Sequence, residues 1–129
     1  MRVKVRLAAA FVAVAFLSKV TWVALSTLRI LAPKGMLLGG KETDELQSKI
    51  KELAEAGNRK LLINLGQTTF MNSVSLGVLI AGHSNYAKRG AQLKLAAVDK
   101  KIQNIFVVTK LSLVFETYDT EDEAIQSFK

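Results

Sequence analysis

The best candidate for a functional residue in this chain is Ser73, because of the pattern that surrounds it. Residues 61–65 form a continuous apolar run that predicts a buried strand, and a short polar stretch follows. After Ser73, Leu76 and Leu79 recur at helical spacing. This order predicts a hydroxyl in the first turn of a helix, beside backbone N–H groups that have no partner within the helix. Such a serine can be modified and recognised by a partner, or it can simply cap the helix.

A phosphate on Ser73 would act on a binding partner rather than on the fold. It would add about −1.5 to −2 charges and three strong acceptor oxygens. A helix N-terminus favours such a charge by about 0.3–1 kcal/mol, so the domain should stay folded. An interface that must bury the phosphate is strongly weakened, and about 1.4 kcal/mol already changes an affinity tenfold. Ser73 would therefore be a switch for protein binding.

No second group of residues in the sequence indicates catalysis or metal binding. The chain has no cysteine and a single histidine, His83, which excludes thiol catalysis, disulfides and cysteine-based zinc sites. His83 falls at helical spacing from Leu79 without a Ser–His–Asp arrangement around it, so we expect a packing residue. Gly35, Gly39 and Gly40 lack the Gly-Lys-Ser/Thr ending of a phosphate-binding loop, which favours a flexible linker. We expect a protein that is not an enzyme and that uses no cofactor and no metal.

The net charge of +7 is not spread evenly along the chain. Residues 1–40 carry six basic residues and no acidic one, whereas residues 41–129 carry 12 basic and 11 acidic residues, a net charge of +1. A nucleic-acid-binding domain usually shows a basic stripe interleaved with aromatic residues. Because this pattern is missing, we expect no nucleic-acid partner.

The N-terminal residues admit several interpretations. Basic residues at positions 2, 4 and 6 precede a stretch, residues 7–28, whose only charge is Lys19. This layout is typical of a secretory signal peptide, and its length would also suit a membrane anchor. The same stretch is also compatible with two N-terminal strands or with a non-native extension. We favour these last two interpretations. We therefore separate residues 1–26 from a domain over residues 27–129, and we expect a cytoplasmic protein, with anchoring through residues 7–28 as the alternative.

The rest of the chain predicts an α/β domain. Strands are predicted at residues 27–31, 61–65, 93–98 and 114–118. Helices are predicted after Thr43, around Ser73, after Asp99 and after Thr120. The helix of Ser73 should direct four side chains inward: Leu76, Leu79, Ile80 and Tyr86. Strands that alternate with helices imply a mixed sheet of four to five strands with about four helices packed on it.

Several short segments, in a fixed order, carry a resemblance to a known family. They are Pro33-Lys34-Gly35, Leu62-Ile63-Asn64-Leu65, Phe70-Met71-Asn72-Ser73, Leu76-Gly77-Val78-Leu79, Val107-Thr109-Leu111-Phe115 and the stretch from Tyr118 to Ala124. Together they resemble the STAS domain, the fold of bacterial anti-sigma factor antagonists, over about residues 27–129.

This resemblance implies a function in signal transduction and transcription regulation. In that family an unphosphorylated antagonist binds an anti-sigma factor, often a serine kinase, and thereby frees the sigma factor. The kinase phosphorylates a serine at the start of the helix after the central strand, and a metal-dependent serine phosphatase reverses the change. That serine falls on Ser73 here. The family commonly has Asp before it and Gly two positions after it, where this chain has Asn72 and Ser75.

The implied docking surface combines two loops, at residues 35–41 and 68–74, with the start of the following helix. Its partner-binding residues would be Gly35, Gly40, Thr68, Thr69, Met71, Asn72, Ser73, Val74 and Ser75. A second interpretation is a STAS subunit of a membrane transport or lipid-trafficking assembly, acting as a protein-interaction module. A small enzyme is disfavoured because no acid–base pair is evident.

Overall fold

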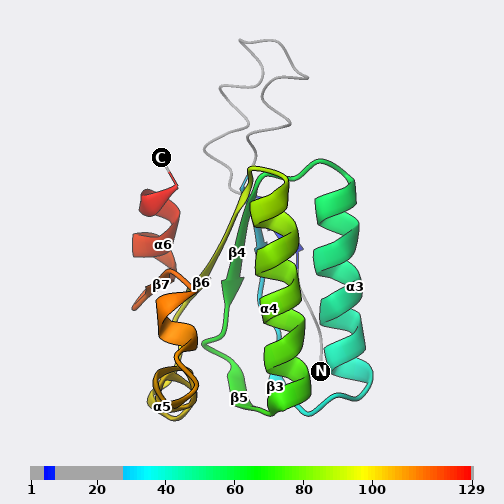
Figure 1. The fold of residues 1–129 in the computed structure, drawn as a ribbon. Coiled ribbons are helices and arrows are strands. Elements are labelled where there is room, and N and C mark those ends of the chain that lie inside the picture. The colour runs from blue at the N-terminus through cyan, green and yellow to red at the C-terminus, as the bar shows by residue number, and fades with distance from the viewer. Residues whose placement is uncertain (1–4, 8–27, 129) are drawn as a thin grey trace.

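A mixed five-stranded sheet forms the centre of the computed structural model, which describes residues 5–7 and 28–128 (Figure 1). The strand order is β1-β2-β4-β6-β7. The strands are β1 Val5–Leu7, β2 Leu28–Leu31, β4 Lys60–Asn64, β6 Gln92–Ala96 and β7 Thr117–Tyr118. β1 runs antiparallel to β2, and the other neighbours are parallel. The predicted α/β fold with a mixed sheet is confirmed.

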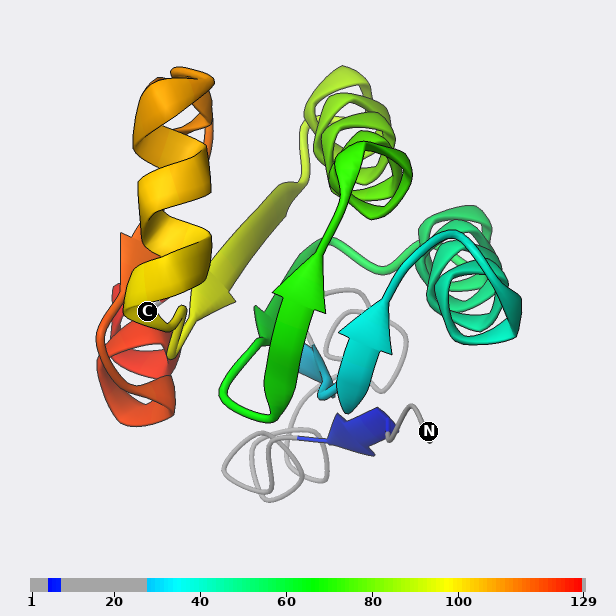
Figure 2. The ribbon, with the colours of Figure 1, turned by 90° about the horizontal axis from the view of Figure 1, so that it is seen from below.

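Helices cover both faces of this sheet. They are α3 Lys41–Glu55, α4 Ser73–Lys88, α5 Lys100–Val108 and α6 Glu121–Ser127, together with the short 3-10 helix η1 Leu111–Leu113. In Figure 2, α3 and α4 lie on one side of the sheet and α6 on the other. In β4, Leu61 and Ile63 pack in the larger core with α3, α4 and α5, whereas Leu62 packs with Phe128 beyond α6. Burial on both faces explains why β4 is apolar throughout.

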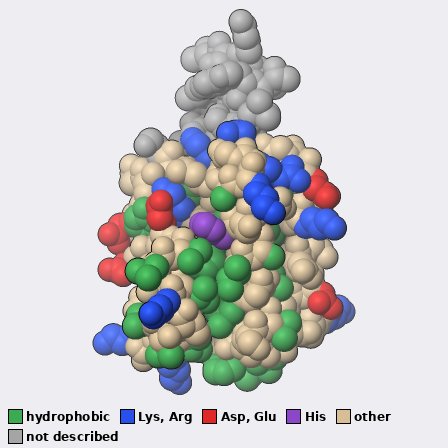
Figure 3. Space-filling model, in the orientation of Figure 1, with side chains coloured by type: hydrophobic (Ala, Val, Ile, Leu, Met, Phe, Trp, Pro, Cys, Tyr) green, Lys and Arg blue, Asp and Glu red, His purple; other side chains and the backbone are tan. Residues whose placement is uncertain are grey.

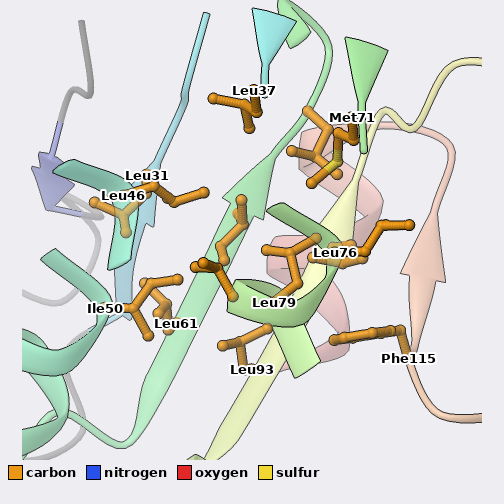
Figure 4. Packing of buried hydrophobic residues seen from close by; sticks show 14 of the residues in the cluster. Leu31, Leu37, Leu46, Ile50, Leu61, Met71, Leu76, Leu79, Leu93 and Phe115 are labelled. Atoms are coloured by element: carbon orange, nitrogen blue, oxygen red, sulfur yellow. The ribbon is translucent and has the colours of Figure 1, made fainter. Parts of the chain in front are cut away.

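A second, two-stranded sheet lies at the end of the molecule where α4 begins. It pairs β3 Gly35–Leu37 with β5 Thr68–Met71 in parallel. Figure 4 shows Leu37 and Met71 directed into the core together with Leu76. β3 corrects the prediction of a flexible linker at Gly35, and β5 corrects that of a loop before Ser73, whereas Gly39 and Gly40 follow β3 in a bend. The backbone N–H and C=O groups of each segment find partners in the other segment, and both segments therefore form strands.

The predicted helix starts agree with the structure except in α3. Its N-cap is Gly40, not Thr43, and the helix begins earlier than predicted. Thr43 is buried in the first turn, where its Oγ1 accepts a hydrogen bond from the Gly39 N–H at 2.9 Å. Asp99 and Thr120 cap α5 and α6 as predicted.

Two further predictions need correction, and one is confirmed. Ile80 is 40% exposed rather than directed inward, although Leu76, Leu79 and Tyr86 are buried. The strand predicted at residues 114–118 is reduced to β7, because η1 and the turn after it occupy the preceding residues. His83 is a packing residue, half-buried with its ring 5.1 Å from that of Phe115.

The signal peptide, anchor or strand predicted within residues 8–27 lies outside the described residues. Within the described ranges, no helix has the length and apolar character needed to cross a membrane.

Candidate functional site

The start of α4 is fixed by a reciprocal pair of caps. The Oδ1 of Asn72 accepts hydrogen bonds from the backbone N–H of Val74 at 3.1 Å and of Ser75 at 3.2 Å. The Oγ of Ser75 in turn accepts from the Asn72 N–H at 3.0 Å and donates to the Asn72 carbonyl oxygen at 3.0 Å. This capping box satisfies donors that the helix itself cannot pair. Asn72 is therefore the N-cap, and Ser73 is the first residue of the helix.

Ser73 is consequently not needed to cap its helix. Ser73 is exposed at the first position of α4. Its hydroxyl makes no hydrogen bond to any residue that the structure describes. No acidic residue lies in the first turn of α4, so a negative group on Ser73 would meet the positive end of the helix dipole without a neighbouring carboxylate in that turn. The hydroxyl can be reached and modified from solvent without breaking a structural bond.

Asn72 also ties α4 to the end of β3. Its Nδ2 donates a hydrogen bond to the Leu38 carbonyl oxygen at 2.9 Å. The backbone N–H of Asn72 points to the Leu37 carbonyl oxygen at 3.4 Å. An aspartate could form the cap but could not donate to Leu38. The amide at this position therefore holds the segment after β3 beside Ser73.

Exposed apolar side chains lie on the elements next to Ser73, in β3, β5 and the first turn of α4 and just after β3. Met36 in β3 is 56% exposed, Leu38 47%, Phe70 in β5 42% and Val74 in α4 55%. Met36 and Phe70 are partners in the register of β3 and β5, so their side chains lie on the same face. In Figure 3 hydrophobic side chains reach the lower end of the molecule, where these elements meet. We call these four residues, together with Ser73, the apolar rim.

Gly39 allows the loop after β3 to pack closely against the start of α4. Its φ of +91° favours glycine, and a Cβ at this position would lie 3.1 Å from Cγ1 of Val74. The loop after β3 therefore approaches α4 more closely than a larger residue would allow.

The predicted partner-binding residues divide into a surface group and a supporting group. Ser73, Val74, Thr69 and Gly40 are exposed, and Asn72 and Gly35 are half-buried. Thr68, Met71 and Ser75 are buried. In this conformation these three side chains cannot contact a partner, and they support the surface instead. The Thr68 hydroxyl, for example, donates to the Pro33 carbonyl oxygen at 2.9 Å.

Met36, Leu38 and Phe70 lie within the two predicted docking loops but were not among the predicted partner-binding residues. In β3 and just after it, Met36, Leu37 and Leu38 are all apolar, so their types do not reveal that only Leu37 is buried. A period of two over three or four residues cannot be distinguished from a short apolar run in the sequence.

Two hollows in the described part of the molecule have linings that do not include Ser73. One of about 160 Å³ lies between α3 and α4 and is lined by residues that include Ile50, Val78 and Gly82. Another of about 110 Å³ lies near His83 and Glu116. Sites for small ligands usually measure about 300–1,000 Å³. Among the described residues no group of three or more His, Asp or Glu side chains could hold a metal ion.

Comparison with known proteins places this geometry in a family. The family model of the STAS domain matches residues 24–124. A structure of a proposed anti-sigma factor antagonist from Thermotoga maritima is similar with a TM-score of 0.73 and 22% identity, over 78% of this chain and 86% of that chain. The phosphorylated form of the Bacillus cell fate determinant SpoIIAA gives a TM-score of 0.65 and 16% identity, over 79% and 91% of the two chains. The STAS domain of a SulP transporter from Vibrio cholerae gives 0.60 and 13%, over 74% and 79%.

Proposed function

Because the chain belongs to the STAS domain family, we propose that it is an anti-sigma factor antagonist that phosphorylation of Ser73 switches off. The observation that carries the proposal is that Ser73 is exposed and belongs to the apolar rim. Anti-sigma factor antagonists are among the proteins that share its fold, and SpoIIAA is known in both unphosphorylated and phosphorylated forms.

The unphosphorylated protein binds its partner through the apolar rim. Burial of a large apolar side chain contributes about 1.5–3 kcal/mol. The apolar rim contains four such residues, enough for a small cluster of dominant contacts at the centre of an interface. The neutral hydroxyl of Ser73 can be covered in such an interface if the partner offers it one hydrogen bond.

Phosphorylation prevents this burial. A phosphate on Ser73 brings about −1.5 to −2 charges into the apolar rim, where they must be stripped of water before the partner can dock. The fold is not affected, because Asn72 and Ser75 supply the cap of α4 without Ser73. The phosphate therefore acts on the complex and leaves the domain intact.

The switch requires two activities that other proteins supply. A serine kinase, which we assign to the anti-sigma factor itself, phosphorylates Ser73, and a serine phosphatase restores the hydroxyl. The protein itself serves as a binding module and substrate, so its function calls for no catalytic group of its own. Release of the sigma factor makes it a regulator of transcription.

A second candidate function is a subunit of a membrane transport or lipid-trafficking complex. The similarity to the STAS domain of the SulP transporter favours it. In that case the apolar rim would dock on another protein of the complex, without control by a kinase. A transporter permease gene beside this gene would support this alternative, whereas a kinase or phosphatase gene would support signalling.

The first test is the position of the phosphate. The purified protein is incubated with the cognate kinase and ATP and analysed by mass spectrometry. We expect one phosphate, on Ser73, and none in Ser73→Ala. Ser84→Ala is the matched control, because Ser84 is an exposed serine on the same helix. Phosphate found only at other positions would contradict the proposal.

The second test is the effect on binding. Ser73→Asp should keep its fold and melting temperature but bind the anti-sigma factor at least about tenfold more weakly, since a charge buried in an interface costs more than 1.4 kcal/mol. Ser73→Ala should stay bound in the presence of ATP. Ser84→Asp should bind as the wild type does. Equal affinities of Ser73→Asp and the wild type would show that Ser73 lies outside the interface.

The third test addresses the apolar rim. Leu38→Ser and Phe70→Ser should each weaken the complex by about 1–3 kcal/mol, as measured by titration calorimetry, with little change in stability. Val108→Ser is the control, because Val108 is 81% exposed on α5, outside the rim. If Val108→Ser weakened the complex as much as Leu38→Ser and Phe70→Ser do, the partner would not dock on the apolar rim.

A further inference from the structure

The end of the molecule opposite Ser73 is strongly basic. There α3 and α4 end, and β2, β4 and β6 begin. In Figure 3 Lys and Arg side chains gather at this upper end. Five basic residues at this end are Arg29, Lys51, Arg59, Lys88 and Arg89, and we call them the basic end. The nearby carboxylates are Glu55 and Glu52, and Glu52 lies 3.9 Å from Lys49.

The contacts at the basic end do not neutralise its charge. Nη2 of Arg59 donates to the Gly90 carbonyl oxygen at 2.8 Å, and Nη1 of Arg89 donates to that of Ala54 at 3.0 Å. The two arginines therefore hold the C-termini of α4 and α3. Lys51 and Lys88 are exposed, and neither forms an ion pair with a residue that the structure describes.

The positive charge exceeds what the two helices require. Each helix C-terminus carries about half a negative charge, so the two ends and two carboxylates offset about three of the five charges. About two positive charges remain on one surface. Capping of the helices alone does not account for them.

We propose that the basic end is a membrane-facing surface that binds the anionic headgroups of a lipid bilayer. Each basic residue near an anionic bilayer strengthens binding about fivefold, so two uncompensated charges give about thirtyfold. A single-stranded nucleic acid is a poorer fit, because its bases need exposed aromatic side chains on which to stack, and the exposed ring of Phe70 lies at the other end.

This orientation leaves the apolar rim free. α4 has 16 residues, which separate Ser73 from the basic end by about 24 Å along the helix. Ser73 then faces away from the bilayer. The proposal does not depend on phosphorylation, and it holds for either candidate function.

The test is co-sedimentation of the full chain with vesicles. We expect binding to phosphatidylcholine vesicles that contain phosphatidylglycerol, weaker binding to pure phosphatidylcholine, and a decrease as the salt concentration rises. Lys51→Glu/Lys88→Glu should reduce partitioning more than about tenfold. Lys100→Glu/Lys101→Glu is the matched control, because it makes the same change of charge at the start of α5, and we expect less than about a twofold effect.

Four results would overturn the proposal. They are no binding to anionic vesicles, equal binding to neutral ones, an equal loss in both double variants, and tighter binding to a DNA duplex that the Lys51→Glu/Lys88→Glu pair abolishes. The last result would identify a nucleic-acid surface. The comparison of the two vesicle types and the salt series use the wild-type protein alone, so the proposal remains testable even if a variant fails to fold.

Discussion

Asn72 combines two roles that can be separated by substitution. It caps α4 through Oδ1 and holds the Leu38 carbonyl through Nδ2. Asn72→Ala removes both and should lower the free energy of unfolding by about 1–2 kcal/mol. Asn72→Asp keeps the cap but places a carboxylate against the Leu38 carbonyl, so its loss of stability should be smaller. Urea unfolding measures both.

The affinity for the anti-sigma factor should change in the same direction in Asn72→Ala and Asn72→Asp. Both lose the link to Leu38, so both should bind more weakly, because Leu38 is no longer held in the apolar rim. Asn72→Ser, which keeps a capping oxygen but has no amide, should behave as Asn72→Asp does. An Asn72→Ala protein as stable as the wild type would contradict the role of the cap.

The position of Ser73 was predictable from the sequence, but its neighbourhood was not. Strand, loop and helix follow one another locally, and the helical spacing of Leu76 and Leu79 marks the first turn. The apolar rim depends on the pairing of β3 with β5, about 30 residues apart in the chain. The sequence alone also could not distinguish a buried Ser75, which completes the cap, from an exposed one.

At the level of elements, two glycines of α4 provide a matched test of how α3 and α4 pack. A Cβ on Gly82 would lie 2.9 Å from Cγ2 of Ile50 in α3, whereas a Cβ on Gly77 would meet nothing within 4 Å. Gly82→Ala should therefore lower the free energy of unfolding by about 1–3 kcal/mol. Gly77→Ala should raise it by up to about 1 kcal/mol, because alanine favours a helix. Equal changes in the free energy of unfolding for Gly82→Ala and Gly77→Ala, measured with urea, would mean that α3 and α4 can move apart at Gly82 without loss of stability.

The elements that were predicted correctly are those with a strong local signal. β4 is a continuous apolar run, and α5 and α6 begin at residues with capping side chains, Asp99 and Thr120. β3 and β5 were not predicted because they are three and four residues long and gain their stability from each other. The start of α3 was predicted too late because Gly40 has no side chain to signal a cap.

Lys94 joins three elements at one edge of the sheet, and this contact should make stability depend on pH. The buried ammonium of Lys94 in β6 donates to the Ser127 carbonyl oxygen at 3.1 Å and lies 3.1 Å from Oε2 of Glu116, just before β7. The hydrogen bond from Lys94, with a second from Tyr118, lowers the pKa of Glu116 below its usual 4.5.

A carboxyl with a lowered pKa stabilises the fold above its unfolded value, and this stabilisation is lost as the pH falls through the folded value. Glu116→Gln should therefore be less stable than the wild type at pH 7, by about 1 kcal/mol or less because the Glu116 side chain is 60% exposed. The difference should shrink as the pH falls from 4.5. Glu52→Gln, which removes the exposed pair with Lys49, controls for loss of charge. A difference that stays constant between pH 6 and about pH 3 would show that the charge of Glu116 does not contribute.

For the molecule as a whole, the two proposed surfaces lie at opposite ends of α4 and should act independently. A charge on Ser73 lies about 24 Å from the basic end, more than twice the Debye length of about 8–10 Å at physiological salt. Substitutions this far apart, without shared contacts, are usually additive within about 0.3–0.5 kcal/mol. Ser73→Asp should therefore change vesicle binding less than about twofold, and Lys51→Glu/Lys88→Glu should change the affinity for the anti-sigma factor equally little.

A three-component sedimentation experiment tests this independence directly. Vesicle-bound wild-type protein should carry the anti-sigma factor into the pellet, and vesicle-bound Ser73→Asp should not. If vesicles instead displaced the anti-sigma factor from the wild-type protein, the two surfaces would overlap, and the apolar rim rather than the basic end would face the bilayer. That result would contradict the orientation along α4, because a rim buried against lipid could not also present Ser73 to a kinase.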